Sequence, residues 1–79
     1  AALMKSSQNI THLNLSKNRI CFQGARDLSS MLKSSKTLLH LDVSENDLEG
    51  PGAELLADAL RINQSLEFLN IERNKIGLL

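Results

Sequence analysis

The chain contains two histidines, His12 and His40, and Asp42 follows the second at a spacing of two residues. Imidazole and carboxylate groups are common zinc ligands and common partners in acid–base catalysis. A metal site would need further ligands at supporting geometry, and we do not expect Asp42 to close a tetrahedral site together with both histidines. The sequence therefore predicts no metal ion, and we assign both histidines to an exposed surface.

Cys21 is the only cysteine of the chain. A nucleophilic thiol needs a base within reach, and the sequence pattern places none beside it. Neither a G-x-S-x-G motif nor a P-loop is present, and the glycines of EGPGAE do not match a phosphate-binding fingerprint. We therefore expect no catalytic residues and no cofactor, and we predict that the chain is not an enzyme.

Charge and composition narrow the range of partners. Nine basic residues balance nine acidic residues in a chain of 79, which argues against binding to nucleic acid or to an anionic membrane through bulk charge. The longest apolar run is far shorter than the roughly 20 residues that span a bilayer. A single cysteine allows no disulfide within the chain. The composition therefore gives no support for an oxidising compartment, for a nucleic-acid partner or for an anionic membrane.

One stretch of the chain occurs three times. LLHLDVSENDL at residues 38–48 recurs as ITHLNLSKNRI at 10–20 and as LEFLNIERNKI at 66–76, with a step of 28 residues. A period of this length indicates a solenoid of stacked repeats. We divide the single segment 1–79 into the end of a preceding repeat (1–9), two repeats (10–37 and 38–65) and a partial repeat (66–79).

Each repeat is expected to contain a short strand and a helix. Leu41 and Val43 alternate with polar residues, as in a half-buried strand. The following GPGAELLADALRIN is typical of an amphipathic helix, with Ala53, Leu56 and Leu60 on its apolar face. Gly24 and Gly52 occupy the same phase in successive repeats, which indicates either a tight turn or a close approach of the backbone to its neighbour.

The pattern L-x-x-L-x-L-x-x-N-x-L, followed by a glycine and an amphipathic helix, resembles a leucine-rich repeat of the ribonuclease-inhibitor-like type. The resemblance covers essentially the whole chain. It implies an α/β fold, a right-handed leucine-rich-repeat solenoid that forms part of a horseshoe, with parallel strands on the concave face and helices on the convex face. Proteins of this type are intracellular and include immune receptors, Ran-type GTPase activators and tropomodulins. The resemblance therefore implies a cytoplasmic, intracellular protein whose partner is another protein. Ribonuclease inhibitor itself alternates two repeat lengths and often carries Cys where this chain carries Asn.

The position of each residue within the repeat predicts three groups of residues outside the apolar core. A structural Asn ladder is expected to satisfy backbone groups in the turns after the strands, and consists of Asn18, Asn46 and Asn74. Side chains expected on the concave face, with Ser16 and Ser44 beside them, are those of His12, Asn14, His40, Asp42, Phe68, Asn70 and Glu72. Two columns of rim charges follow the strands and alternate in sign, namely Lys17–Glu45–Arg73 and Arg19–Asp47–Lys75. The acid at the centre of each column could pair with the bases on both sides and fix the register between repeats. Alternatively, these charges could simply be solvated.

Phe68 has two possible roles, as an anchor for a partner or as a contact to an adjacent repeat. We predict a scaffold for protein–protein interaction that binds its partner through the concave face. The alternatives are a regulatory segment of a Ran-type GTPase-activating protein and a purely structural repeat in a large assembly. We also expect flanking repeats of the same chain to cover the apolar ends at Leu3–Met4 and Leu78–Leu79, and the 79 residues alone to be poorly folded or to associate.

Overall fold

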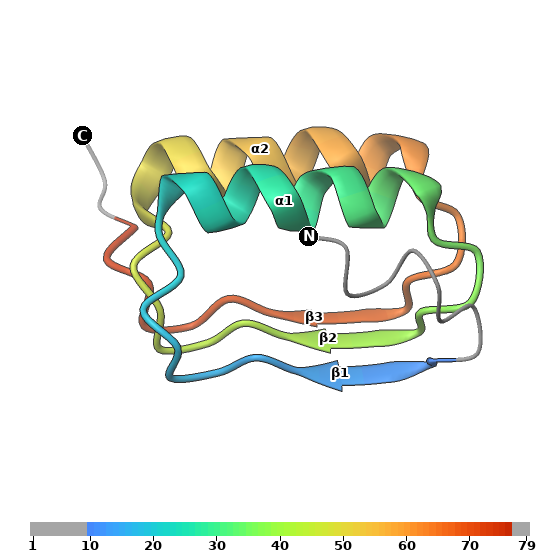
Figure 1. Cartoon of the computed structure of the whole chain (residues 1–79), viewed down its shortest axis with the longest axis horizontal. Coiled ribbons are helices and arrows are strands. Elements are labelled where there is room, and N and C mark those ends of the chain that lie inside the picture. Colours follow the sequence, from blue (N-terminus) through green and yellow to red (C-terminus); the bar gives the residue numbers. More distant parts are fainter. Residues whose placement is uncertain (1–9, 77–79) are drawn as a thin grey trace.

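The computed structural model describes residues 10–76, so the interpretation of residues 1–9 and of Leu78–Leu79 lies outside the described residues. Strands and helices alternate along the chain (Figure 1). In order, the elements are β1 (His12–Asn14), α1 (Phe22–Ser34), β2 (His40–Asp42), α2 (Glu49–Ile62) and β3 (Phe68–Asn70). The expected strand and helix are present in the repeats 10–37 and 38–65, and the described part of the third repeat contains its strand.

The three strands form one parallel sheet in the order β1-β2-β3. Its register places Leu41 opposite both Leu13 and Leu69. Backbone hydrogen bonds continue beyond the short strands, because the N–H of Leu15 donates to the carbonyl of Asp42 at 2.7 Å and that of Val43 donates to Asn70 at 2.9 Å. The parallel sheet and the two helices confirm the expected α/β repeat fold.

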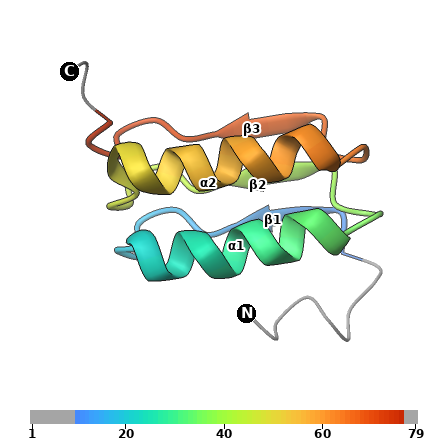
Figure 2. The same cartoon turned by 90° about the horizontal axis from the view of Figure 1, so that it is seen from above.

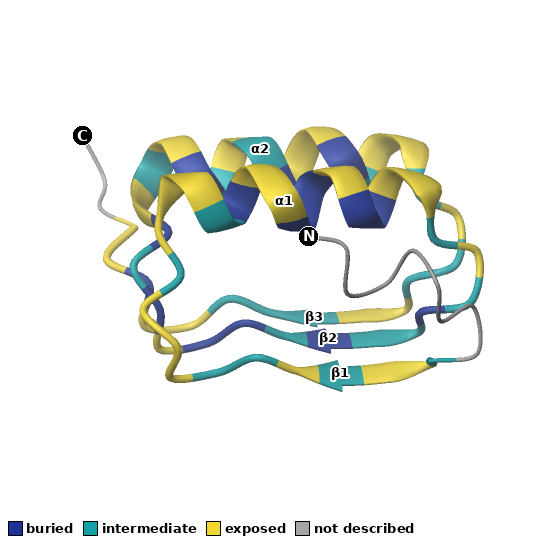
Figure 3. Cartoon of the chain, viewed as in Figure 1, coloured by how far each residue is buried: buried dark blue, intermediate teal, exposed yellow. Residues whose placement is uncertain are grey.

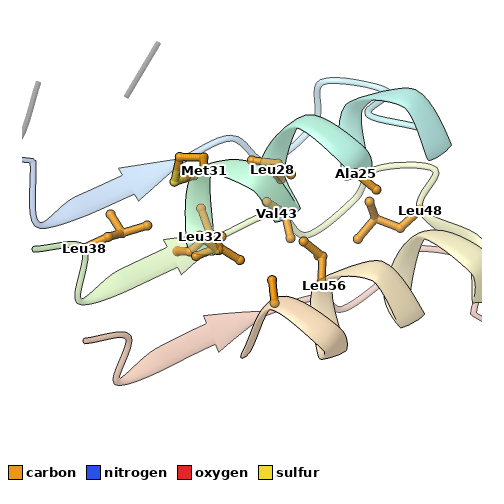
Figure 4. Packing of buried hydrophobic residues seen from close by; sticks show 10 residues of the cluster. Ala25, Leu28, Met31, Leu32, Leu38, Val43, Leu48 and Leu56 are labelled. Carbon is orange, nitrogen blue, oxygen red and sulfur yellow. The ribbon is translucent and has the colours of Figure 1, made fainter. Parts of the chain in front are cut away.

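The helices form a second layer over one face of the sheet (Figure 1) and lie side by side (Figure 2). Their buried side faces the strands and their outer side is exposed (Figure 3). Apolar side chains from both layers meet between them, among them Leu32, Leu38, Val43, Leu48 and Leu56 (Figure 4). Removing this apolar surface from water is the main term that stabilises the stack.

The middle strand has the most deeply buried side chains. Leu41 is fully buried, whereas Leu13 and Leu69 are only partly buried, although all three occupy equivalent positions. The reason is that Leu41 has a described strand on each side, and each outer leucine has one on one side only. A repeat therefore completes its own core only through its neighbours.

The buried face of α2 differs from the expected one. Gly52, Leu56 and Ala59 are buried, whereas Ala53 and Leu60 are only partly buried. A Cβ atom added to Gly52 would lie 3.4 Å from the Cβ atom of Ala25 on α1. No glycine in the described part of the chain has a positive φ. Of the two roles considered for this glycine position, the structure therefore supports the close approach and not the tight turn.

Buried asparagines tie each turn to the turn of the preceding repeat. The Oδ1 atom of Asn46 accepts hydrogen bonds from the backbone N–H groups of Asn18 at 2.8 Å and Ile20 at 2.9 Å. Its Nδ2 group donates to the carbonyl of Leu15 at 3.0 Å and to that of Val43 at 2.8 Å. One amide thus serves donors and acceptors in two successive repeats, which an apolar side chain could not do.

Asn18 and Asn74, the other two asparagines of this column, show when an asparagine links two turns. Asn74 is also buried, and its Nδ2 group donates to Val43 in the preceding repeat and to Ile71 in its own. Asn18 is exposed, and its side chain donates to the carbonyl of Ser16 at 3.0 Å. Within residues 10–76, Asn46 and Asn74 each link their own turn to the turn of the preceding repeat, whereas the side chain of Asn18 bonds within its own turn.

The turns held in this way have an unusual backbone. Lys17, Glu45 and Arg73 occupy the same position in three successive turns and have φ values of 60°, 54° and 57°. For residues other than glycine, this left-handed conformation costs on the order of 1–3 kcal/mol and persists only where its surroundings hold it. We attribute its persistence to the hydrogen bonds of Asn46 and Asn74 to these turns. This conformation is not predictable from the residue types, because none of the three residues is glycine or asparagine.

Substitution of Asn46 tests this dependence. We expect Asn46→Ala to lower the free energy of unfolding by about 2–4 kcal/mol, because it leaves buried backbone groups of two turns without partners. Asn18→Ala is the matched control, and should lower it by less than about 1 kcal/mol because that side chain is exposed. Urea unfolding of the three proteins measures both differences. Equal losses for the two variants would contradict the structural role that we assign to the buried amide.

Candidate functional site

The sheet has one face under the helices and one face turned away from them (Figure 1). We call the second the open face. Because side chains alternate along a strand, the buried Leu41 places its two neighbours in β2 on this opposite side. Two columns of side chains cross the open face, and consist of His12–His40–Phe68 and Asn14–Asp42–Asn70.

The first column is a stack of aromatic rings. The ring centroids of His12 and His40 are 4.3 Å apart with planes inclined by 13°, and those of His40 and Phe68 are 5.4 Å apart with planes inclined by 29°. Neighbouring strands are separated by about 4.8 Å, which is a suitable distance for stacking of rings in register. Phe68 remains 49% exposed, so the column presents apolar surface to solvent.

The second column repeats one hydrogen bond three times. The Oδ1 atom of Asn14 accepts from the N–H of Ser16 at 2.9 Å. In the same way, Asp42 accepts from Ser44 at 2.9 Å, and Asn70 accepts from Glu72 at 3.0 Å. These are Asx-type turns, in which a side-chain oxygen satisfies a backbone donor two residues further on. All three side chains therefore fix the start of the turn after their strand.

Ser44 does not lie where the sequence analysis placed it. We expected it on the concave face, but only 9% of the residue is exposed, and its hydroxyl donates to Oδ1 of Asp42 at 2.6 Å. Hydrogen bonds from the Ser44 hydroxyl, and secondarily from its N–H, hold the pKa of the Asp42 carboxyl below its ordinary value. Ser44 therefore orients the Asp42 carboxyl and stabilises its ionised form.

A shallow depression lies between the two columns. Its volume is about 240 Å³, and it is lined by side chains from both columns, including His40, Asp42 and Phe68. Small-molecule sites usually enclose about 300–1,000 Å³ and bury most of the ligand. A depression of this size and openness suits a side chain of a larger partner better than a free small molecule. Glu72, two residues beyond Asn70, is exposed.

The two columns of rim charges do not form the expected ladders. Asp47 pairs with Lys75 at 3.1 Å, but within the described range it makes no ion pair with Arg19. Likewise, residues 10–76 contain no ion pair of Glu45 with Lys17 or Arg73. The side chains of Lys17, Glu45 and Arg73 are exposed and belong to residues with left-handed backbone. At these positions, solvation of the charges outweighs ion pairing.

Other chemistry is sparse in the part of the chain that the structure describes. Residues 10–76 contain no group of three or more His, Cys, Asp or Glu side chains that could hold a metal ion. Cys21 is exposed and occupies the N-cap position of α1. Of the described helices, neither is long and apolar enough to cross a membrane.

The contribution of Ser44 leads to a prediction about ionisation. Ser44→Ala removes the hydroxyl donor and keeps the backbone N–H, so we expect the pKa of Asp42 to rise toward its ordinary value without reaching it. A carboxyl with a lowered pKa stabilises the fold above its unfolded-state pKa, and this contribution is lost as the pH falls through the folded-state pKa. Stability of the variant should consequently depend less on pH in the acid range. NMR titration of the Asp42 carboxyl carbon measures the shift, and an unchanged pKa would contradict the assignment.

Comparison with known proteins agrees with this geometry. A family model described as Leucine Rich repeat matches residues 6–29, 34–57 and 63–78, which together make up most of the chain. No curated protein matches the sequence. Domains of this family commonly mediate protein–protein interactions and are typically not enzymes. The three matched repeats, the parallel strands and the alternating helices show that the chain belongs to the leucine-rich repeat family.

Proposed function

We propose that this chain is a segment of a right-handed solenoid of the ribonuclease-inhibitor-like type and that its open face, the concave face of the horseshoe, binds another protein. Residues paired across the sheet are 28 positions apart, which supports a repeat of that length. We further propose that it acts in the cytoplasm. The single cysteine, which is free and exposed, supports a reducing compartment.

The exposed aromatic column carries this proposal. Phe68 presents a large apolar surface, although a side chain of this kind is usually withdrawn from water. Its ring is already ordered by stacking on His40, and the strand beneath it is fixed by the sheet. Binding would therefore bury apolar surface without a large loss of side-chain entropy, and this combination is typical of an interface hot spot.

The polar column supports the same face. Asn14 and Asn70 use Oδ1 within the fold, and no hydrogen bond of their Nδ2 groups is present among the described residues. These amides are available as donors to a partner. Apolar rings beside a row of hydrogen-bonding groups match the composition of a protein interface, in which an apolar centre is bordered by polar contacts.

Phe68→Ala tests the proposed function. The chain is immobilised and incubated with an extract of the cells that produce it, retained proteins are identified by mass spectrometry, and the affinity of each is then measured with purified protein. We expect Phe68→Ala to weaken the specific complex at least about 30-fold, as for a hot-spot residue that contributes about 2 kcal/mol.

Phe22→Ala is the matched control, because Phe22 is similarly exposed, at 45%, but begins α1 in the helix layer. It should leave the affinity within about threefold of the original protein. Urea unfolding of both variants establishes that each remains folded. If no retained protein distinguishes Phe68→Ala from the original chain, the proposal is wrong.

A further inference from the structure

Asp42 differs from its two neighbours in the polar column in one respect, which is its charge. Asn14 and Asn70 accept the same backbone hydrogen bond as Asp42, at 2.9 and 3.0 Å compared with 2.9 Å. An amide oxygen therefore meets the need of this turn as well as a carboxylate oxygen does. The negative charge of Asp42 is not required by the Asx turn.

The second oxygen of Asp42 has no partner among the residues that the structure describes. Both hydrogen bonds from Ser44 go to Oδ1, and within residues 10–76 neither a hydrogen bond nor an ion pair involves Oδ2. A partner that covers the open face would remove this ionised oxygen from water. Unless the partner supplies a charged donor, that step costs considerable free energy.

The surroundings of Asp42 favour a cation over an anion. Among the six side chains of the two columns, Asp42 is the only acid, and there is no Lys or Arg. Glu72, whose backbone N–H donates to Oδ1 of Asn70, is exposed in the turn after β3 and is a further acid near this column. The two columns therefore carry one carboxylate and no Lys or Arg, although the whole chain has nine basic and nine acidic residues.

The shape of the depression beside Asp42 also favours a basic side chain. The depression beside Asp42 has walls formed by the rings of His40 and Phe68 and holds about 240 Å³. Long basic side chains bury their aliphatic stems against apolar surface and keep the charged end at a polar site. Asn14 and Asn70 lie one strand away on each side, at a spacing of about 4.8 Å, with donors for neighbouring carbonyl groups.

We infer that this depression receives a lysine or arginine side chain from a loop of the partner protein, with its charged nitrogen donating to Oδ2 of Asp42. The stem of that side chain packs against His40 and Phe68. Backbone carbonyls on both sides of the basic residue accept from the amides of Asn14 and Asn70. This inference rests on the proposed function, and adds the chemistry by which the partner is recognised.

Asp42→Asn is the decisive variant, because Asn14 and Asn70 show that an amide keeps the turn intact. The probe is the tripeptide acetyl-Gly-Lys-Gly-amide, or its Arg counterpart, titrated at millimolar concentration into the labelled chain. We expect saturable NMR shifts of the Asn14 and Asn70 side-chain amides and of the Phe68 ring. Asp42→Asn should abolish them, and acetyl-Gly-Glu-Gly-amide should not produce them. Equal shifts with the Glu peptide or with Asp42→Asn, or no shifts at all, would overturn the inference.

The protein retained through Phe68 provides the second readout. Asp42→Asn should weaken that complex at least about tenfold, and Asp42→Lys more strongly, because a desolvated charge pair is lost and then replaced by repulsion. Asp58→Asn is the control, since Asp58 is an exposed acid on α2. Added salt should weaken the original complex more than the Asp42→Asn complex.

The two proposals fail in different ways. If Phe68→Ala weakens binding but Asp42→Asn and Asp58→Asn both bind like the original chain, the recognition of a basic residue is wrong and the open face is still the binding surface. If no protein depends on Phe68, the proposed function is wrong, whereas the tripeptide titration still decides whether the site beside Asp42 prefers a cation.

Discussion

The stack of repeats depends on how the backbone is hydrogen-bonded where each strand ends. A buried N–H or C=O group without a partner is costly, and a turn between a strand and a helix leaves several such groups at once. Asn46 provides an acceptor and a donor at one point, and it joins its own turn to the preceding one. Asn74 repeats the arrangement one step further along the stack. Because the same amide also holds strained left-handed residues, the turns are fixed in conformation as well as in position.

A fixed turn gives a fixed register, and the register creates the open face. Residues at one position of the repeat lie about one strand spacing apart, which brings His12, His40 and Phe68 into a single stack. None of these three rings is needed to fill the core, since the apolar residues between the layers do that. The repeat therefore separates two tasks: the leucines and asparagines maintain the scaffold, and the residues between them determine what the surface can bind.

Asp42 shows how a single position can serve both tasks. Its Oδ1 atom makes the turn contact that asparagine makes in the neighbouring strands, and the hydrogen bonds of Ser44 orient the carboxyl and favour its ionised form. Asp42 also lines the depression beside Phe68, and within residues 10–76 no hydrogen bond or ion pair involves its Oδ2 atom. A change from Asp to Asn at this position would retain the scaffold and alter the surface, so partner preference and stability are separable here.

The sequence by itself determined the parts of this protein that depend on burial. Leucines in phase with a strand and a helix predict which side chains turn inward, because the free energy of burying apolar surface is large and recurs in every repeat. Tertiary structure alone decided the burial of Ser44 and the left-handed backbone at Glu45. It also decided that Asp47 pairs with Lys75 and, within residues 10–76, not with Arg19. Exposed ion pairs contribute little free energy, so an alternation of charges in the sequence does not determine which of them form. The backbone of a turn, in turn, is set by contacts to the neighbouring repeat, which a local sequence pattern does not contain.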